Sequence, residues 1–208
     1  MSAESGIRAL FVDIGGVILS NGWDRASRRR AAERFRLEAD EVDERHHLTF
    51  DTFETGKLTL EEYLDRVIFY RPRSFTREEF RAFMLDQSEA LPEMEGFLRR
   101  LKAQCHLKLV AVSNEGRELA EHRIRHFRLG EYIDAFVVSS FVHVRKPDTD
   151  IYRIALDLAQ TPVERVLYLD DRELFVEVAR TLGIRGLHHR AMASTASEMA
   201  EWGLHASG

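Results

Sequence analysis

Four short segments of this 208-residue chain place side chains that could do chemistry next to apolar runs. Paired acidic positions can form the oxygen-ligand site that Mg²⁺ prefers. A lysine ammonium and a serine hydroxyl can bind phosphate oxygens, and an aspartate can attack phosphorus to form an aspartyl-phosphate that water hydrolyses. Together these residue types predict phosphoryl chemistry at one site. The residues are Asp13; Ser113 with Asn114; Lys146; and Asp170 with Asp171.

Asp13 follows the apolar run 9–12 and comes shortly before Gly15 and Gly16. A continuous apolar run is typical of a strand that is buried on both faces of a parallel sheet. Open α/β sheets bind ligands at the carboxyl ends of their strands, and glycines let the backbone approach a ligand closely. The segment alone also fits an aspartate that caps an ordinary turn, so the other three segments decide in favour of an active-site loop.

The chain beyond residue 91 alternates between predicted helices and strands, which indicates βαβ units and a parallel sheet. Right-handed crossovers bring the carboxyl ends of all these strands to one edge. Pro147 fits the first turn of a helix and places Lys146 just outside that helix. We therefore expect the polar side chains to gather at one edge of the sheet. The predicted strands are 107–112, 135–139, 165–169 and 184–187; the predicted helices are 93–104, 116–127, 148–159, 172–182 and 194–202.

Between the first strand and residue 91 the sequence is charged and predicts helices without strands. Two helix starts show the capping-box pattern, in which an acid follows a threonine by three residues. We predict an α/β core of residues 1–19 and 91–208, interrupted by a helical domain of residues 20–90. The capping boxes are Thr59 with Glu62 and Thr76 with Glu79; the predicted helices are 23–35, 39–48, 59–69 and 76–88.

The composition is that of an ordinary globular protein, with 44% hydrophobic and 31% charged residues. A net charge of −5 and a pI of about 6.0 predict neither a nucleic-acid nor a membrane partner, and the arginines at 28–30 are expected to form a solvated helix face. We find no 18-residue apolar run and no signal sequence, so we expect a cytoplasmic protein. The single cysteine, Cys105, excludes an internal disulfide and is expected to be buried.

The four segments resemble the four motifs of the haloacid dehalogenase-like (HAD) hydrolase superfamily, in the same order and over roughly residues 7–190. The helical domain after the first motif is similar to the small cap of that superfamily. Residues 53–63 resemble the branch of sugar-phosphate phosphatases such as glucose-1-phosphatase. The resemblance implies a Rossmann-like α/β core with a helical cap. It also implies a Mg²⁺-dependent hydrolase that acts on a small phosphorylated metabolite, as a monomer or a homodimer.

The resemblance also implies roles around the phosphate. Asp13 matches the nucleophile, and Lys146 matches the residue that neutralises both the nucleophile and the phosphate. Ser113 matches a donor to the phosphate oxygens, and the backbone amide of Asn114 is a further candidate donor. Asp13 and Lys146 are therefore the predicted catalytic residues, and Ser113 and Asn114 the predicted substrate-binding residues.

The magnesium site is predicted in the same way. Asp171 matches the metal ligand of the last motif, and Asp13 matches the ligand of the first. The backbone carbonyl of Gly15 is the third predicted ligand. Asp170 is expected to support the metal beside Asp171, without direct coordination or through a water molecule.

Two positions depart from the pattern of the superfamily. Most of its phosphatases carry a second aspartate two residues after the nucleophile, which protonates the leaving alcohol; here that position is Gly15. General acid–base catalysis of this kind contributes about 10² to 10⁴ in rate. Glu115 or a cap residue could supply the proton, although Glu115 also fits an acid at a helix N-terminus. Phe175 stands where the superfamily often has an aspartate or asparagine that supports the metal or the lysine, and we expect that a phenylalanine cannot support either of them.

A phosphatase that hydrolyses a small phosphate monoester, such as a sugar phosphate, is the function that we expect. A sugar 1-phosphate has a good leaving group and would need little protonation. One alternative is a 2-haloacid dehalogenase, which also lacks the second aspartate, but a metal-free site gains little from Asp170 and Asp171. The other alternative is a degenerate, non-catalytic HAD-fold binding protein. The presence of all four matched residues argues against that alternative: Asp13, Ser113, Lys146 and Asp171.

The cap is expected to determine the substrate because it closes over the active site and excludes water. His46 and His47 are not expected to bind one metal ion, because adjacent residues of a helix do not share a face. The candidates that could face the substrate from the cap are Asn21, Trp23, His46, His47, Phe50 and Phe53.

Overall fold

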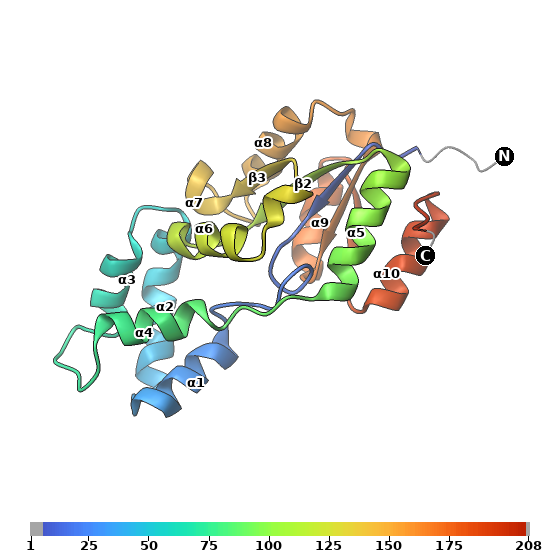
Figure 1. The fold of residues 1–208 in the computed structure, drawn as a ribbon. Coiled ribbons are helices and arrows are strands. Elements are labelled where there is room, and N and C mark those ends of the chain that lie inside the picture. Colours follow the sequence, from blue (N-terminus) through green and yellow to red (C-terminus); the bar gives the residue numbers. More distant parts are fainter. Residues whose placement is uncertain (1–5, 207–208) are drawn as a thin grey trace.

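The computed structural model describes residues 6–206 and contains a five-stranded parallel sheet (Figure 1). The strand order is β3-β2-β1-β4-β5, so the strand before Asp13 is central. This architecture confirms the predicted α/β class. The strands are β1 (Ala9–Val12), β2 (Lys108–Ser113), β3 (Ala135–Val138), β4 (Val166–Asp170) and β5 (Arg185–His188).

The register of the sheet aligns the ends of its three central strands. Val12 at the end of β1 pairs with Ala111 of β2 and with Leu169 of β4. Asp13 therefore leaves the sheet at the same edge as the residues that end β2 and β4. All four residues of β1 are buried, which is why this strand consists of apolar residues alone.

Helices cover both faces of the sheet (Figure 1). Successive residues of β1 point to opposite faces, so Leu10 packs in one apolar cluster and Phe11 in the other. The first cluster contains residues of α5 (Pro92–Cys105) and α10 (Met192–Glu201). The second contains residues of α8 (Thr149–Ala159) and α9 (Glu173–Thr181). The remaining helical segments of the core are α6 (Arg117–His126), α7 (Ser139–Val142), η1 (Leu129–Glu131) and η2 (Val163–Arg165).

Four helices between β1 and α5 gather at one end of the molecule in Figure 1 and share a third apolar cluster. Both predicted capping boxes are present, at the starts of α3 and α4. Leu119 of α6 packs in the same cluster, so this layer rests on the core. We call α1–α4 the cap helices; the exact domain boundaries remain a prediction. The cap helices are α1 (Arg25–Phe35), α2 (Ala39–Glu54), α3 (Leu60–Val67) and α4 (Arg77–Leu85).

Helix α2 is longer than predicted: it continues past Leu48 to Glu54. The sequence around Leu48 breaks the apolar pattern because this leucine is exposed, but the helix still buries Thr49 and Phe53. Residues four apart share a helix face, so the additional turns align His46, Phe50 and Glu54. Most other predicted boundaries differ by one to three residues, and the short helix α7 was not predicted.

The C-terminal end of α2 is fastened to the core. The hydroxyl of Ser139 donates a hydrogen bond to the carbonyl of Glu54, at 2.6 Å. The ring of Phe53 packs so closely on Gly116 that a Cβ atom there would overlap it. A Cβ atom at Gly56, where φ is +71°, would likewise overlap the carbonyl of Ser140. This end of the helix is therefore held by close packing as well as by a hydrogen bond.

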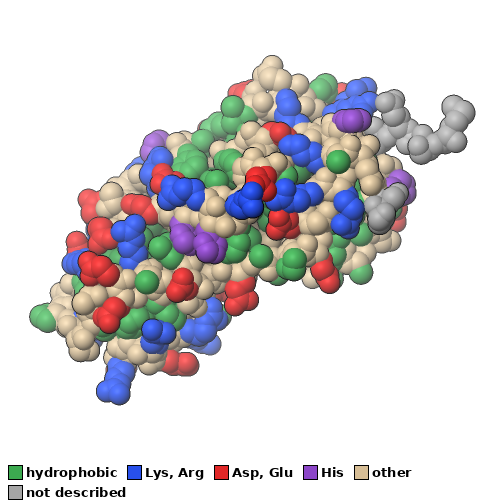
Figure 2. All heavy atoms as spheres, in the orientation of Figure 1, with side chains coloured by type: hydrophobic (Ala, Val, Ile, Leu, Met, Phe, Trp, Pro, Cys, Tyr) green, Lys and Arg blue, Asp and Glu red, His purple; other side chains and the backbone are tan. Residues whose placement is uncertain are grey.

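Acidic and basic side chains are interspersed on the face of the molecule shown in Figure 2. Within residues 6–206, none of the helices has the length and apolar character needed to cross a membrane. Cys105 is partly exposed and not buried as predicted, because it is the last residue of α5 and lies at the surface end of that helix.

Candidate active site

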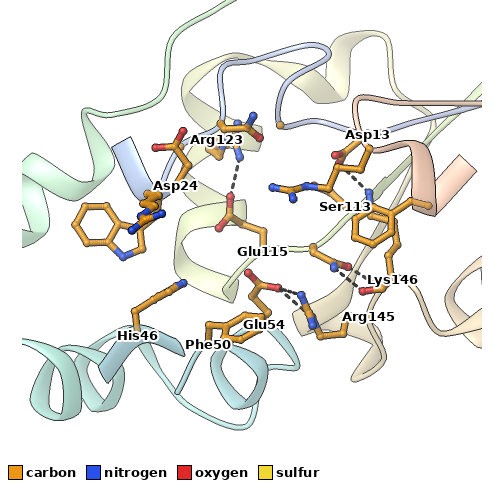
Figure 3. A pocket seen from close by; sticks show the side chains of 18 of the residues that line it. Asp13, Asp24, His46, Phe50, Glu54, Ser113, Glu115, Arg123, Arg145 and Lys146 are labelled. Carbon is orange, nitrogen blue, oxygen red and sulfur yellow. Dashed lines mark hydrogen bonds and ion pairs between the residues drawn. The ribbon is translucent and has the colours of Figure 1, made fainter. Parts of the chain in front are cut away.

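A cavity of about 340 Å³ lies between the carboxyl edge of the sheet and the cap helices (Figure 3). Its volume suits a small metabolite. Residues from both parts of the chain line it, so the predicted site residues and residues of the cap face the same space. From the core come Asp13, Gly15, Ser113, Asn114 and Lys146; from the segment between β1 and α5 come Asn21, Trp23, His46, Phe50 and Glu54.

Lys146 is 1% exposed and is fixed by three oxygen atoms. Its Nζ lies 2.7 Å from Oδ2 of Asp170 and 3.2 Å from Oδ1 of Asp13, and it donates a hydrogen bond to the carbonyl of Val112 at 2.9 Å. Burial favours the neutral amine, but the two carboxylates outweigh burial and raise the pKa of Lys146. The ammonium is therefore charged and held beside Asp13.

The side chain of Asn114 has a role that was not predicted. Its Nδ2 donates to the carbonyl of Lys146 at 2.9 Å, and its Oδ1 accepts from the amide of Lys146 at 2.8 Å. This pair of hydrogen bonds fixes the backbone that carries the lysine. Asn114 thus positions Lys146 through its side chain, and a role in phosphate binding is left to its backbone amide.

The carboxyl of Asp13 is buried, and burial raises its pKa to about 6. Lys146 opposes this shift, and the carboxylates of Asp170 and Asp171 add to it by repulsion. Ser113 lies at the end of β2, is 3% exposed and acts on Asp13 through a hydrogen bond that lowers its pKa. The site therefore holds more negative charge than Lys146 alone can balance.

Asp170 is fully buried, and protein groups already satisfy both of its oxygen atoms. Oδ2 accepts from Lys146 and from the hydroxyl of Tyr168, and Oδ1 accepts from the amide of Arg172 at 2.7 Å. Its main contact is thus with Lys146. This arrangement supports the prediction that Asp170 does not coordinate the metal directly.

Asp171 is partly exposed, but its Oδ1 is buried and has no hydrogen-bond partner in the described part of the chain. Its other oxygen accepts a long hydrogen bond, 3.3 Å, from Asn21. A buried carboxylate oxygen without a hydrogen-bond partner is costly, so this oxygen fits the role of a metal ligand. Ligand oxygens of Asp13, Asp170 and Asp171 lie within 4.8 Å of one another, and such oxygen donors fit Mg²⁺.

Gly16 makes the approach of Asp171 possible. Its φ of +73° lies in the left-handed region, and a Cβ atom at this position would overlap the carboxyl group of Asp171. Both the backbone conformation and the contact therefore require glycine here.

Gly15 faces a buried arginine that was not predicted. A Cβ atom on Gly15 would lie 2.9 Å from Oδ1 of Asn21 and 3.8 Å from NH1 of Arg123. Arg123 donates to the carbonyl of Ser20 at 2.6 Å and forms an ion pair of 2.7 Å with Glu115, while its Nε has no partner among residues 6–206. Glu115, the candidate acid, is thus bound to a cation, as the dashed line between Glu115 and Arg123 shows (Figure 3).

The position of Arg123 on helix α6 is the sequence feature that could have identified it as a buried residue. Positions 119, 120, 123 and 127 form one stripe of the helix, and the other three are apolar. An arginine on an apolar stripe is expected to be buried, and Arg123 is 4% exposed. A buried guanidinium needs hydrogen-bond or ion-pair partners. Its hydrogen-bond partner, the carbonyl of Ser20, lies more than a hundred residues earlier in the sequence. The helical pattern could therefore indicate that Arg123 is buried, but not which residue it contacts.

Glu54 is a second residue that was not predicted, because the helix was expected to end before it. Arg145 binds it through NH2 at 2.8 Å and through Nε at 3.0 Å. Burial raises the pKa of Glu54 to about 7; Arg145 opposes this shift and Glu115 adds to it. The pair links α2 to the residue before Lys146.

Phe175 lines the cavity and contacts Lys146 with its ring, whose centroid lies 5.1 Å from Nζ. A cation is attracted to the face of an aromatic ring, so Phe175 supports the ammonium in place of a polar side chain. The prediction that phenylalanine cannot support the lysine was wrong for this reason.

Four of the six cap candidates line the cavity: Asn21, Trp23, His46 and Phe50. His47 is exposed and lines only a neighbouring surface pocket. Phe53 is 3% exposed and stacks on Tyr63 at 4.5 Å between ring centroids, so its prediction as a substrate contact was wrong.

The arginine run 28–30 is only partly a solvated face. Arg29 and Arg30 are exposed. The side chain of Arg28 is 11% exposed, bonds Asp43 at 2.8 Å and lines the cavity. The prediction was therefore wrong for Arg28, because the first turn of α1 points this residue back toward α2.

A family model described as haloacid dehalogenase-like hydrolase matches residues 7–183. The match spans most of the chain and includes all four segments that carry the polar side chains. It therefore agrees with the resemblance found in the sequence.

Two curated relatives are similar to the chain. The phosphorylated carbohydrates phosphatase of Thermotoga maritima is 28% identical over 132 residues, which are 64% of this chain and 56% of that protein. The drimenol cyclase drtB of Aspergillus calidoustus is 27% identical over 190 residues, which are 87% of this chain and 34% of that protein. The chain thus spans about half and about a third of the length of these relatives.

Solved structures share the fold. A HAD family enzyme of Bacteroides thetaiotaomicron superposes with a TM-score of 0.79 at 18% identity, covering 93% of this chain and 98% of that chain. Its complex with magnesium and inorganic phosphate gives 0.75 at 19% identity, covering 89% and 96%. The L-2-haloacid dehalogenase of Xanthobacter autotrophicus gives 0.64 at 13% identity, covering 94% and 83%. At these identities the likeness establishes the fold alone.

Proposed function

Because the chain belongs to the haloacid dehalogenase-like hydrolases, we propose that it hydrolyses a small phosphate monoester with Mg²⁺ as its cofactor. The observation that carries the proposal is the buried Oδ1 of Asp171, which lies near the carboxyl of Asp13 and has no hydrogen-bond partner among the residues that the structure describes. Two relatives add support: one is named a phosphorylated carbohydrates phosphatase, and one structure contains magnesium and inorganic phosphate.

Asp13, Asp171 and the backbone carbonyl of Gly15 would hold the ion. Bound Mg²⁺ supplies positive charge that offsets the repulsion between an anionic nucleophile and an anionic phosphate. Its charge would also favour the ionised form of Asp13, whose pKa is raised to about 6 without it. The ion would thus offset the negative charge of the carboxylates that Lys146 alone does not neutralise.

An oxygen of Asp13 then attacks phosphorus, the bond to the leaving oxygen breaks, and an aspartyl-phosphate forms. Lys146 and the hydroxyl of Ser113 hold the other phosphate oxygens, with the backbone amide of Asn114 as a third donor. Water attacks the phosphorus of this intermediate, which releases inorganic phosphate and restores the carboxylate. Asn114 and Asp170 keep Lys146 in place throughout.

The leaving oxygen departs without the usual carboxylic acid. The guanidinium of Arg123 lies near Gly15: its NH1 and NH2 atoms are 3.8 and 3.9 Å from where a Cβ atom of residue 15 would be, behind the closer amide of Asn21. An arginine stays protonated, so it stabilises negative charge and does not transfer a proton. We therefore expect substrates whose leaving group is stable as an anion, with Glu115 holding the guanidinium in place.

A dehalogenase is the second candidate, since the fold is shared with L-2-haloacid dehalogenases and a halide leaves without a proton. The oxygen-rich cluster of Asp13, Asp170 and Asp171 favours the phosphatase, because halide displacement by an aspartate requires no metal.

The test is a hydrolysis assay on p-nitrophenyl phosphate and a panel of phosphate monoesters that includes sugar 1-phosphates. We expect release of phosphate that requires Mg²⁺, stops in EDTA and disappears in Asp13→Asn. L-2-chloropropionate, assayed in parallel for chloride release, should not react. Chloride release without a metal would support the dehalogenase instead, and no turnover of any compound would support the binding protein.

A further inference from the structure

Helix α2 presents His46, Phe50 and Glu54 to the cavity from one face. The proposed phosphatase mechanism uses none of these three residues. The ring of His46 stacks on that of Phe50, with centroids 5.5 Å apart, and reaches from α2 into the cavity (Figure 3). It therefore faces the space that the organic part of a phosphate ester would occupy.

Two hydrogen bonds at the hydroxyl of Tyr63 determine which nitrogen of the His46 ring carries the proton. Nε1 of Trp23 lies 2.8 Å from the hydroxyl oxygen of Tyr63, and Nδ1 of His46 lies 2.8 Å from the same oxygen. An indole N–H can only donate, so the tyrosine oxygen accepts from Trp23. Tyr63 is fully buried, and no described residue offers its proton another acceptor. The hydroxyl therefore donates to Nδ1 of His46.

The imidazole that accepts this bond is neutral. Burial lowers the pKa of His46 to about 3, and the positive charge of Arg28 acts in the same direction, against Asp43. With Nδ1 as an acceptor, a neutral ring carries its hydrogen on Nε2. The hydrogen bond of the His46 ring uses Nδ1, and within residues 6–206 Nε2 is not among the buried atoms that lack a partner, so Nε2 is accessible where His46 lines the cavity. A single N–H donor is thus aimed at the cavity.

The charged groups nearby are already paired. Arg25 and Arg28 both bind Asp43, at 3.1 and 2.8 Å. The carboxylate of Asp24 accepts hydrogen bonds at the start of α1. This end of the cavity therefore has little net charge, which favours an uncharged group of the substrate over a second anion.

We infer that His46 is a specificity-determining residue, whose Nε2–H donates to a hydroxyl or carbonyl oxygen on the organic part of the substrate. The inference rests on the proposed phosphatase function and names a substrate class for it: phosphate esters with an uncharged oxygen acceptor at this position. An ammonium group there has no lone pair to offer and would be rejected. Trp23 and Tyr63 act as positioning residues, since together they hold the ring in one tautomer.

The tautomer can be measured without any substrate. In protein labelled with [¹⁵N]histidine, the ring nitrogens of His46 are assigned by comparison with His46→Gln. At pH 7 we expect a neutral ring with the proton on Nε2, and in Tyr63→Phe a mixture of tautomers. A proton on Nδ1, or a charged ring, in the natural protein would overturn the inference.

The second measurement compares kcat/KM for α-D-glucose 1-phosphate with that for p-nitrophenyl phosphate, a phosphate whose aromatic group carries no hydroxyl. We expect this ratio to fall at least tenfold in His46→Phe, mainly through KM, and to fall less in Tyr63→Phe. His47→Phe is the matched control, because His47 is the next residue of α2 and lies outside the cavity. It should leave the ratio unchanged.

Singly deoxygenated glucose 1-phosphates complete the test. One of them should lose affinity for the natural protein and show no further loss with His46→Phe, because the variant and the analogue remove the same hydrogen bond. Equal ratios in the natural protein and His46→Phe, with Mg²⁺-dependent hydrolysis of p-nitrophenyl phosphate intact, would overturn this inference and leave the proposed function standing. Loss of all hydrolysis in the natural protein would overturn the proposed function itself.

Discussion

Asp170 and Asp171 are neighbours in the sequence, but their carboxylates have different surroundings. Asp170 is buried and bound by Lys146, whereas Asp171 keeps one oxygen without a partner in the described structure. Removing one charge of a buried ion pair costs about 3–5 kcal/mol. The two residues should therefore respond to the same substitution in opposite ways.

We expect Asp170→Asn to lower the free energy of unfolding by several kcal/mol and to change the half-activating Mg²⁺ concentration little. Asp171→Asn should raise that concentration at least tenfold and leave stability equal or higher, because repulsion with Asp13 is removed. Urea unfolding and Mg²⁺ titration of activity measure the two effects. Equal shifts of Mg²⁺ activation in both variants would contradict the assignment.

Glu54 predicts a pH dependence of stability. Its pKa in the folded protein is about 7, above its ordinary value of 4.5, so the folded state binds this proton more tightly than the unfolded state does. The stabilisation is complete below about pH 4.5 and is lost as the pH rises through about 7. Relative to Glu54→Gln, the natural protein should lose on the order of 1–3 kcal/mol over this range. Denaturant unfolding at a series of pH values measures the difference, and a rise with pH would show that Arg145 keeps Glu54 ionised.

Arg123 predicts a dependence on the leaving group. With a fixed cation and no acid, kcat/KM should fall steeply as the pKa of the leaving alcohol rises. Arg123→Gln should steepen this dependence, with a loss of about 10² for poor leaving groups, and Arg123→Lys should preserve part of the effect. Rates for a series of aryl and alkyl phosphates test this, with thermal unfolding as a check on folding. A flat dependence in the natural protein would mean that another group protonates the leaving oxygen.

At the scale of secondary-structure elements, helix α2 connects the other cap helices to the active site. Its C-terminal half contributes His46 and Phe50 to the cavity, and its last turn is fastened to the core at Ser139 and Gly116. The position of the cavity wall therefore depends on how the end of α2 packs on the core.

Gly116→Ala tests that dependence. The backbone at Gly116 has ordinary dihedral angles, so alanine meets no conformational strain, but its Cβ atom would overlap the ring of Phe53. We expect a destabilisation of about 1–3 kcal/mol and lower activity. Gly130→Ala is the matched control because nothing lies within 4 Å of its Cβ position. Phe53→Leu combined with Gly116→Ala should restore stability; if Gly116→Ala has no effect, the packing does not constrain α2.

Across the whole molecule, the sheet and the residues at its edge could be predicted because their signals are local. The apolar run before Asp13 and the alternation after residue 91 follow from burial in a parallel sheet. The approach of Lys146 to Asp13 follows from that topology. The positions of these residues could therefore be predicted without knowing how the cap helices pack.

The remaining part of the site depends on packing between distant segments. Helix α2 continues to Glu54 because Phe53 finds a surface on the core, which no local pattern reveals. The chain from Trp23 through Tyr63 to His46 joins three cap segments, and its geometry exists only after they have packed. The cap could thus be predicted as a set of helices, but not as a cavity wall.

Magnesium binding should also stabilise the molecule as a whole, because Asp13 and Asp171 meet only in the folded chain. A ligand at a hundred times its dissociation constant adds about 2.7 kcal/mol to the free energy of unfolding. We expect Mg²⁺ to raise the melting temperature of the natural protein and to have a much smaller effect on Asp171→Asn. Differential scanning calorimetry with Ca²⁺-free buffers measures this, and equal shifts would exclude Asp171 as a ligand.

The contact between Gly16 and Asp171 has a consequence for how this sequence can vary. The first motif and the last meet at a point where no atom can be added to the glycine. A mutation at position 16 therefore acts as a mutation of the carboxylate on the other loop. A library that randomises the loop around position 16 while keeping Asp171 should therefore recover glycine at 16 in every active clone.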